Sequence, residues 1–334
     1  MTSRHREQQG ARAMAVAVRT SSSRGKRVKI VVAFLTIYLV WGTTFLAIRI
    51  AVETLPAFMM AGLRFFLAGS VMLVIWLARG GYFPSLRHWR SAAIVGGLML
   101  TGGIGLVSFA EQRVSSGLAA LMVATIPVWI TLLEWLGFGG KRPGTKTFVG
   151  LGLGFAGVAL LFVSTGDMGV SVDDLTGMAI VLLGALLFAI GSLYSRRAAL
   201  PDDTRLSTAS EMLAAGLLLL LVSLLAGEFG RLDAATISMR SILALAYLTV
   251  FGSIIGYTAY LWLLKTVEPA MVSTNFYVNP VIAVLVGWLL AGETVTLTMV
   301  VAAAVILLGV VTINGTLPRL TRRREPGSAQ PEAR

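Results

Sequence analysis

The sequence contains no cysteine and only two histidines. Without cysteine there can be no disulfide, no thiolate nucleophile and no cysteine-ligated metal. The histidines, His5 and His88, lie in an N-terminal tail and in a loop, so we expect neither a histidine metal site nor a Ser-His-Asp triad. The chain is therefore not expected to be an enzyme or to carry a metal or cofactor.

Charged residues are also scarce, at 13% of the 334 residues, whereas 56% of the chain is hydrophobic. A typical soluble domain has about 25% charged and about 45–50% apolar residues. So apolar a chain would expose too much hydrophobic surface to water. At about 20 residues per span, its length allows about ten membrane-spanning helices. We predict a multi-pass membrane protein with the lipid bilayer as its surroundings.

Ten hydrophobic segments are long enough to be spans, and basic segments without such a run flank them. Residues 1–29 and 315–334 are rich in arginine, which predicts disordered cytoplasmic tails. The predicted spans are 30–51, 56–78, 91–109, 117–138, 147–165, 177–195, 208–227, 241–264, 270–291 and 296–314.

The positive charge is distributed unevenly between alternate loops. With the N-terminus inside, most of the 28 lysines and arginines fall on the inner segments, while the loop with Asp167, Asp173 and Asp174 falls outside. Cytoplasmic loops carry an excess of basic residues. We therefore expect both termini in the cytoplasm of a bacterium, with the spans in its inner membrane. The net charge of +12 then needs no nucleic-acid partner.

Two segments of the chain, 114–140 and 267–293, align without gaps. They belong to spans four and nine, which are five crossings apart and so run in opposite directions. This predicts two inverted five-helix repeats, 30–165 and 177–314, in an all-α protein of ten transmembrane helices. Inverted repeats are typical of transporters that work by alternating access. The identical pairs are Val114/Val267, Pro127/Pro280, Val128/Val281, Leu132/Leu285, Trp135/Trp288, Leu136/Leu289 and Gly139/Gly292.

Three stretches carry a shared pattern: residues 41–49 with 63–65, residues 116–120 with 126–127, and residues 267–293 with their Asn279-Pro280 and Gly292-Glu293. Together they resemble the EamA family of the drug/metabolite transporter superfamily. The resemblance implies ten helices around a central cavity and export of small metabolites, often amino acids. The family often ends this motif with Gly-Glu in both halves. The first copy here has Gly140-Lys141 instead, so any inference from that glutamate applies only to Glu293.

Pro127 and Pro280 lie near the middle of spans four and nine. A proline removes one backbone hydrogen bond of a helix, and paired interruptions in two repeats point to a transporter's binding site. We predict that both prolines break their helices, line the cavity and serve in gating, with Trp129 close by. The alternative is a kink that only shapes the bundle.

Arg64 lies eight residues beyond Pro56, about 12 Å along a helix. A charge inside the membrane costs at least about 2.5–3.5 kcal/mol, so Arg64 should face the bundle interior. There it could bind a substrate carboxylate with two parallel hydrogen bonds. The alternative is a structural arginine bonded to carbonyls or to a carboxylate of another span.

Polar and aromatic side chains interrupt several spans at helical spacing. Asn275 and Asn279 share one face of span nine, as Tyr257 and Tyr260 do on span eight. With Trp41 and Thr44 on span one, they would form an amphiphilic pocket for a small, partly apolar solute. The alternatives are hydrogen bonds between helices and an interfacial aromatic belt, to which we assign Tyr194.

Acidic residues occur at span ends and not in mid-membrane. Glu134, near the inner end of span four, is a candidate for proton coupling, or else it reaches the headgroups. Glu293 would complement the N-terminus of the last span, with Thr294 or Thr296 as its cap. Arg49 and Glu53 have the spacing of a helical ion pair. The lack of a mid-membrane carboxylate weakens the case for obligatory proton antiport.

Residues 152–157 match the pattern G-x-G-x-x-G. Nucleotide binding through this pattern requires a preceding strand and a soluble βαβ unit, which this apolar segment cannot supply. Gly150 and Gly154 also form G-x-x-x-G, a spacing that lets membrane helices pack closely. We predict helix packing here.

Together these features predict a secondary transporter that exports small metabolites, with amino acids, aromatic ones included, as the leading substrate class. A multidrug exporter or an exporter of other metabolites, such as nucleosides or cations, is the alternative. A channel or an intramembrane enzyme fits less well. Besides the substrate and the bilayer no partner is needed, and a monomer suffices.

Overall fold

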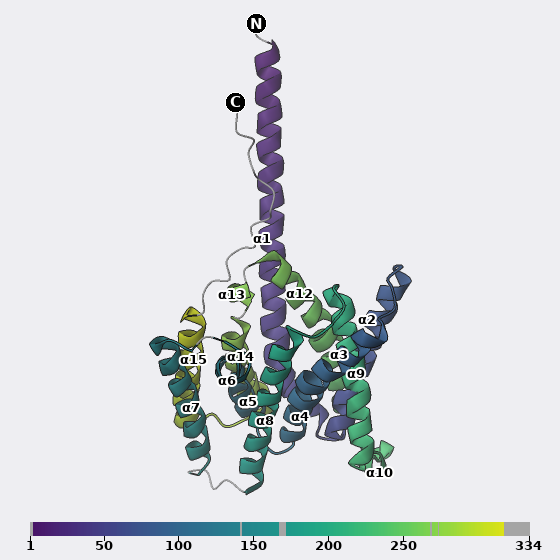
Figure 1. Ribbon diagram of the computed structural model, residues 1–334, viewed down its shortest axis with the longest axis vertical. Coiled ribbons are helices and arrows are strands. Elements are labelled where there is room, and N and C mark those ends of the chain that lie inside the picture. Colours follow the sequence, from purple (N-terminus) through teal and green to yellow (C-terminus); the bar gives the residue numbers. More distant parts are fainter. Residues whose placement is uncertain (1–2, 141, 167–171, 268, 273, 317–334) are drawn as a thin grey trace.

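The computed structural model describes residues 3–140, 142–166, 172–267, 269–272 and 274–316. Within these ranges every regular element is a helix, and Figure 1 shows the helices gathered around α1. The predicted all-α class is confirmed for this part of the chain.

The helices follow one another closely, and several predicted spans consist of two or three consecutive helical segments. The first half contains α1 (Ser3–Ala51), α2 (Ala57–Ala78), α3 (Leu86–Gly96), η1 (Gly97–Gly105), α4 (Leu106–Ala110), α5 (Ser116–Val123), α6 (Ile126–Gly137) and α7 (Thr145–Gly166). The second half contains α8 (Val172–Ser195), α9 (Thr204–Leu225), α10 (Glu228–Arg231), η2 (Ala234–Thr236), α11 (Met239–Tyr247), η3 (Leu248–Ile255), α12 (Gly256–Thr266), α13 (Pro269–Val272), α14 (Asn275–Ala291) and α15 (Leu297–Thr316).

Seven helical stretches in the described residues are long and apolar enough to cross a membrane. They coincide with the predicted spans one to four and six to eight. Three shorter apolar stretches coincide with spans five, nine and ten: Thr145–Leu161, Val278–Ala291 and Leu297–Ile313. The chain is thus a multi-pass membrane protein.

The N-terminal tail continues directly into the first span. Helix α1 begins at Ser3, and the tail contains no proline and several alanines and arginines, which are good helix formers. The disorder of residues 1–29 stays a prediction. At the other end α15 reaches Thr316, and the rest of the predicted tail 315–334 lies outside the described residues.

Helices of the first half pack mainly on helices of the second half. Helix α2 packs on α9, α7 on α15, and α5 on α14. Helix α1 lies against α11, η3 and α12, and in the same way α8 lies against α3, η1 and α4. Figure 1 shows the α2–α9 and α7–α15 pairs at opposite edges of the bundle, with α1 between them.

Two π-helices occur at matching places in the two halves. η1 (Gly97–Gly105) continues α3, and η3 (Leu248–Ile255) continues α11. Each lies in the third predicted span of its half. A π-helical turn shifts the hydrogen-bond pattern of a helix and occurs frequently at functional sites. The hydrophobic pattern of a π-helix does not differ from that of an α-helix, so the sequence predicts neither segment.

Glycines bring α7 and α15 into backbone contact. A methyl group added at Gly309 would lie 2.7 Å from the carbonyl oxygen of Gly150 and 2.8 Å from the backbone nitrogen of Gly154. At Gly157 it would lie 2.5 Å from a carbon of Ile306. The predicted packing role of Gly150 and Gly154 is confirmed.

This contact makes Gly150→Ala destabilising. The new methyl group would lie 2.8 Å from the carbonyl oxygen of Gly309, so the helices must separate, which we expect to cost about 1–3 kcal/mol. Gly152→Ala is the matched control, because nothing lies within 4 Å of that position and alanine favours helix. Thermal unfolding in detergent, followed by tryptophan fluorescence, should show a lower midpoint for Gly150→Ala alone. Equal midpoints would contradict the close contact.

Candidate functional site

Arg64 is buried inside the bundle, with 4% of its surface exposed. It lies on α2, and its Nε donates a 2.9 Å hydrogen bond to Oγ of Ser253 in η3. The guanidinium carbon lies 5.0 Å from the ring centre of Phe65. No described residue forms a hydrogen bond with Nη1 or Nη2 of Arg64. One edge of the guanidinium is therefore fixed by the protein, and the other two nitrogens remain available to a ligand.

Three aromatic rings contact one another near Gly252, the residue before Ser253. The ring centre of Trp41, on α1, lies 5.5 Å from that of Tyr257 and 5.2 Å from that of Tyr260 on α12. Trp41 also donates from Nε1 to the carbonyl oxygen of Gly252 at 3.1 Å. We call Trp41, Arg64, Ser253, Tyr257 and Tyr260 the Arg64 cluster. It brings together four of the residues that the sequence predicts.

Gly252 makes the close approach of α1, α2 and η3 feasible. A methyl group at this position would lie 3.1 Å from Nη2 of Arg64 and 3.1 Å from Cγ2 of Thr44. Thr44 therefore borders the cluster, but its hydroxyl donates to the carbonyl of Trp41 in its own helix. Thr44 shapes the site, and its oxygen is already engaged.

Asn275 and Asn279 lie on α14, which packs against α1. The Oδ1 atom of each is buried and accepts no hydrogen bond from a described residue. At Gly42 an added methyl group would lie 3.5 Å from the carbonyl oxygen of Asn279, so the two helices approach closely there. A buried polar atom without a partner is uncommon in native proteins, so these two amides are candidates for contact with water or a ligand.

Trp129 and Glu134 have no described contact with the Arg64 cluster. Trp129 packs edge-on against Phe155 of α7, with ring centres 5.3 Å apart. Its Nε1 is buried without a partner among the described residues. Glu134 forms a 2.9 Å ion pair with Arg196, and both side chains are largely exposed. A carboxylate this exposed is typical of a residue at the level of the lipid headgroups, whereas a proton carrier is typically buried.

The two prolines differ in their effect. Span four is interrupted between α5 and α6, and Pro127 lies in the first turn of α6, which confirms the predicted break. Pro280, in contrast, lies inside α14, so a break at this residue is wrong. In membrane helices neighbouring groups can satisfy the carbonyl that a proline frees. The interruption of span nine comes earlier, where α13 ends at Val272 and α14 begins at Asn275.

Glu293, in the second half of the chain, accepts hydrogen bonds from residues of the first half. Its Oε1 accepts hydrogen bonds from the backbone nitrogen and hydroxyl of Ser116, at 2.8 and 2.7 Å, and its Oε2 accepts one from Gly117 at 3.0 Å. It therefore stabilises the N-terminus of α5, not that of α15 as predicted. The predicted cap of α15 by Thr296 is confirmed, since its Oγ1 accepts from Met299 at 3.2 Å.

Arg49 is also bonded differently from its prediction. It donates from Nη1 to the carbonyl oxygens of Glu111 and Val114. Glu53 pairs with another residue, since its Oε2 lies 3.8 Å from Nη1 of Arg240. The expected Arg49–Glu53 pair is therefore wrong. The Glu111 carbonyl, at the C-terminus of α4, lacks a helical partner and carries partial negative charge, and Val114 lies in the loop that follows. Both carbonyls are therefore open to the guanidinium.

Two functional candidates escaped the sequence analysis because they are polar residues near loops. Glu228 accepts hydrogen bonds from the backbone nitrogens of Phe58 and Met59 at 3.3 and 2.9 Å, and so fixes the start of α2. Glu111 follows α4 and is fully buried. Neither of its carboxyl oxygens has a hydrogen-bond partner in the described residues. Burial raises the pKa of Glu111 well above its ordinary value.

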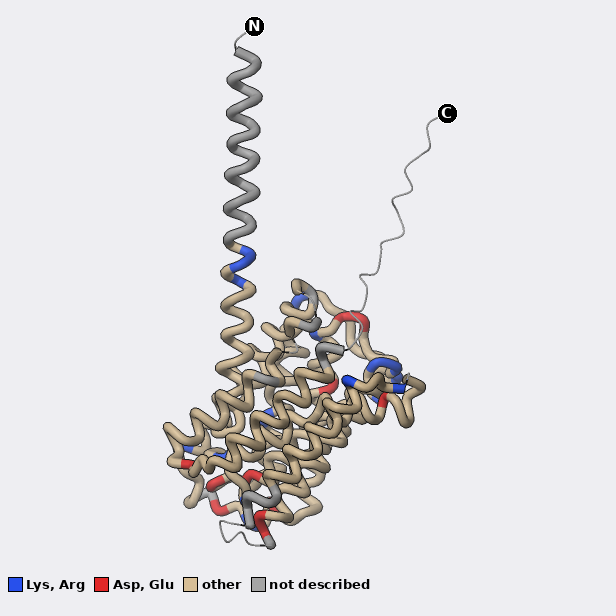
Figure 2. The backbone as a smooth tube through the Cα atoms, turned by 90° about the vertical axis from the view of Figure 1, so that its left-hand side faces the viewer, with Lys and Arg blue, Asp and Glu red and all other residues tan. Residues whose placement is uncertain are grey.

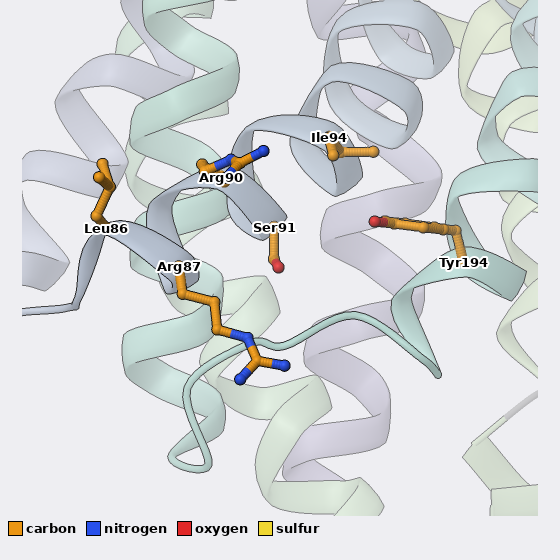
Figure 3. Close-up of a pocket in the computed structure, with 6 residues that line it drawn as sticks. All are labelled: Leu86, Arg87, Arg90, Ser91, Ile94 and Tyr194. Atoms are coloured by element: carbon orange, nitrogen blue, oxygen red, sulfur yellow. The ribbon is translucent and has the colours of Figure 1, made fainter.

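A surface hollow of about 540 Å³ lies between the start of α3 and the end of α8 (Figure 3). Arg87 and Arg90 line it together with Tyr194, which the sequence analysis assigned to the interfacial belt. None of its lining residues belongs to the Arg64 cluster. Among the described residues, no group of three acidic or histidine side chains is placed to hold a metal ion.

Comparison with known proteins agrees with this architecture. The sequence model of the EamA-like transporter family matches residues 28–163 and again residues 175–315. The "Uncharacterized inner membrane transporter YedA" of Escherichia coli (strain K12) is 41% identical over 282 residues, covering 84% of this chain and 89% of that protein. The "Uncharacterized transporter YoaV" of Bacillus subtilis (strain 168) is 25% identical, covering 85% and 96%. A solved crystal structure with 22% identity superposes with a TM-score of 0.58, covering 86% of this chain and 97% of the other.

The Glu293 contacts make this side chain important for stability. In Glu293→Ala the backbone donors of Ser116 and Gly117 lose their acceptor, which we expect to cost about 1–3 kcal/mol. Glu53→Ala serves as control, because its exposed pair with Arg240 should contribute less than about 1 kcal/mol. Thermal unfolding of both variants in detergent measures the difference. A Glu293→Ala midpoint equal to that of the control would show that the cap is dispensable.

Proposed function

The chain belongs to the EamA-like transporter family, and on this premise we propose that it exports small metabolites across the bacterial inner membrane by alternating access. Amino acids, aromatic ones among them, are the proposed substrates. The observation that carries this choice is the Arg64 cluster. Its buried guanidinium has free Nη atoms and lies close to Gly252, to which Trp41 bonds. Tyr257 and Tyr260 pack on Trp41.

The proposed mechanism needs two similar halves that rock against each other. We therefore propose ten spans in two inverted five-helix modules, 30–165 and 177–314. The double match to the family supports this, and so do the packing of each half on the other and the matching positions of η1 and η3. In such transporters the binding site lies between the repeats, near interrupted helices.

The proposed orientation has both termini in the cytoplasm. Figure 2 shows lysines and arginines mainly at the end of the bundle from which α1 extends, and most acidic residues at the opposite end. An excess of lysine and arginine is typical of the cytoplasmic side. In this orientation Arg196 and Glu134 lie at the inner face, while Glu53 and Arg240 lie at the outer face.

An amino acid would use different parts of the cluster at its two ends. The free nitrogens of Arg64 suit a carboxylate, which guanidinium groups bind with two parallel hydrogen bonds. Trp41, Tyr257 and Tyr260 offer ring surfaces for an apolar or aromatic side chain. Asn275 and Asn279, on the helix beside Trp41, would add amide oxygens as hydrogen-bond acceptors. The combination favours a solute with one anionic and one apolar end.

Counterflow in proteoliposomes tests the proposed function. Vesicles containing the protein are loaded with an unlabelled amino acid, and entry of labelled phenylalanine is followed with and without a pH gradient. A carrier gives saturable entry that requires the loaded amino acid, whereas a channel gives entry without it. If no amino acid supports exchange, the substrate class is wrong, and nucleosides and cationic drugs become the next candidates.

Arg64 variants test the carboxylate site. Arg64→Lys keeps the charge but cannot bind a carboxylate through a planar fork, so we expect the KM for phenylalanine to rise by about tenfold, equivalent to about 1.4 kcal/mol. Arg240→Lys, at an exposed position, should behave as the wild type. An unchanged KM for Arg64→Lys would argue against the carboxylate site. A loss of exchange that accompanies a lower unfolding midpoint would indicate a structural arginine.

A further inference from the structure

Two opposite charges are buried in the bundle without pairing with each other. Arg64 is 4% exposed and Glu111 is 0% exposed. The ion pairs found among the described residues join Arg196 to Glu134 and Arg240 to Glu53, all of them exposed. Helix α2, which carries Arg64, packs on α4, which ends one residue before Glu111, so the two side chains come from neighbouring elements. Each still lacks an ionic partner.

Glu111 is held in place by its backbone and its neighbours, not by its carboxyl group. It caps the C-terminus of α4, and its carbonyl oxygen accepts from Arg49. The preceding Phe109 stacks on Phe58 of α2, with ring centres 5.2 Å apart, and the guanidinium of Arg113 lies 4.8 Å from the Phe109 ring centre. The main chain is thus fixed on both sides, while the carboxyl oxygens are left free.

The charged groups around Glu111 come from several elements. Arg49 on α1 and Arg64 on α2 favour its charged form, whereas Glu293, before α15, opposes it. Arg113 follows on the same loop. Helix α8, which packs on α4, carries two more acidic residues in its first turn, Asp173 and Asp174.

A carboxylate buried without a hydrogen bond or a cation is strongly disfavoured. Two occupants would relieve this: a proton on the carboxyl group, or a cationic group that donates hydrogen bonds to it. In the same way, the free nitrogens of the buried Arg64 guanidinium favour an anionic group that accepts hydrogen bonds from them. An amino acid carries both complementary charges on groups bonded to the same carbon atom, so one ligand could neutralise both side chains.

We propose that Glu111 binds the ammonium group of the substrate whose carboxylate Arg64 binds, and that it holds a proton when the site is empty. This rests on the proposed function. When the substrate enters, the proton leaves the Glu111 carboxyl oxygen for water on the loading side, and the ammonium group donates hydrogen bonds to the resulting carboxylate. When the substrate departs on the other side, a proton from that side returns to Glu111. Each cycle exchanges one substrate for one proton.

Competition between proton and substrate can be measured without any variant. Counterflow of labelled phenylalanine is recorded between about pH 6 and pH 8, with equal pH on both sides, and we expect its KM to rise on acidification by up to about tenfold per pH unit. Unlabelled 3-phenylpropionate, which lacks the ammonium group, and phenethylamine, which lacks the carboxylate, should both compete more weakly than phenylalanine.

Variants then assign the effect to one carboxyl group. Glu111→Gln should lose both the pH dependence of KM and the preference for phenylalanine over 3-phenylpropionate, whereas Glu111→Asp should keep both. Asp202→Asn, an exposed carboxylate changed in the same way, should behave as the wild type. Unfolding midpoints of all variants accompany the transport data.

The outcomes separate this inference from the proposed function. Wild-type exchange with a pH-independent KM would overturn the role of Glu111 and leave the amino-acid transporter intact. Equal competition by phenylalanine and 3-phenylpropionate would do the same, as would a pH dependence that survives in Glu111→Gln. If the wild type exchanges no amino acid at any pH, both the substrate class and this inference fail.

Discussion

A polar group inside this bundle must find its partner within the protein, because the surrounding lipid offers none. Much of the interior follows from this constraint. Glu293 and Glu228 satisfy the free backbone nitrogens at the starts of α5 and α2. Arg49 satisfies two carbonyls between the end of α4 and the start of α5. In each case a charged side chain from one part of the chain stabilises the helix end of another.

The exceptions to this rule are as informative as the rule. Glu111, Asn275 and Asn279 keep buried oxygens without partners in the described residues, and Arg64 uses only one nitrogen for bonding within the protein. An unsatisfied buried group lowers stability, so its presence calls for a ligand, a proton or water. These side chains come from α2, α14 and the loop after α4, and so from both halves of the chain.

Much of the fold could be predicted because hydrophobic length and charge placement are local properties. Seven predicted spans coincide with helices of sufficient length, and the family resemblance read from three short stretches is confirmed by the match to residues 28–163 and 175–315. The grouping of Trp41, Arg64, Tyr257 and Tyr260 followed from one argument: polar and aromatic residues in apolar helices turn toward each other. The same argument predicts that Trp129 lies at the cavity, but its ring packs on Phe155 instead. The spacing of residues on one helix does not identify the neighbouring helix.

By itself the sequence determined that the chain is helical, crosses the membrane several times and contains a costly buried arginine, because these depend on composition and on periodicity along one segment. Only the tertiary structure decided which backbone groups Glu293 and Arg49 bond, where the π-helices η1 and η3 occur, and that Glu111 is buried. These features depend on contacts between residues far apart in the chain. A glutamate beside a loop has the same sequence signature in water or inside the bundle, and the packing of α4 against its neighbours makes the difference.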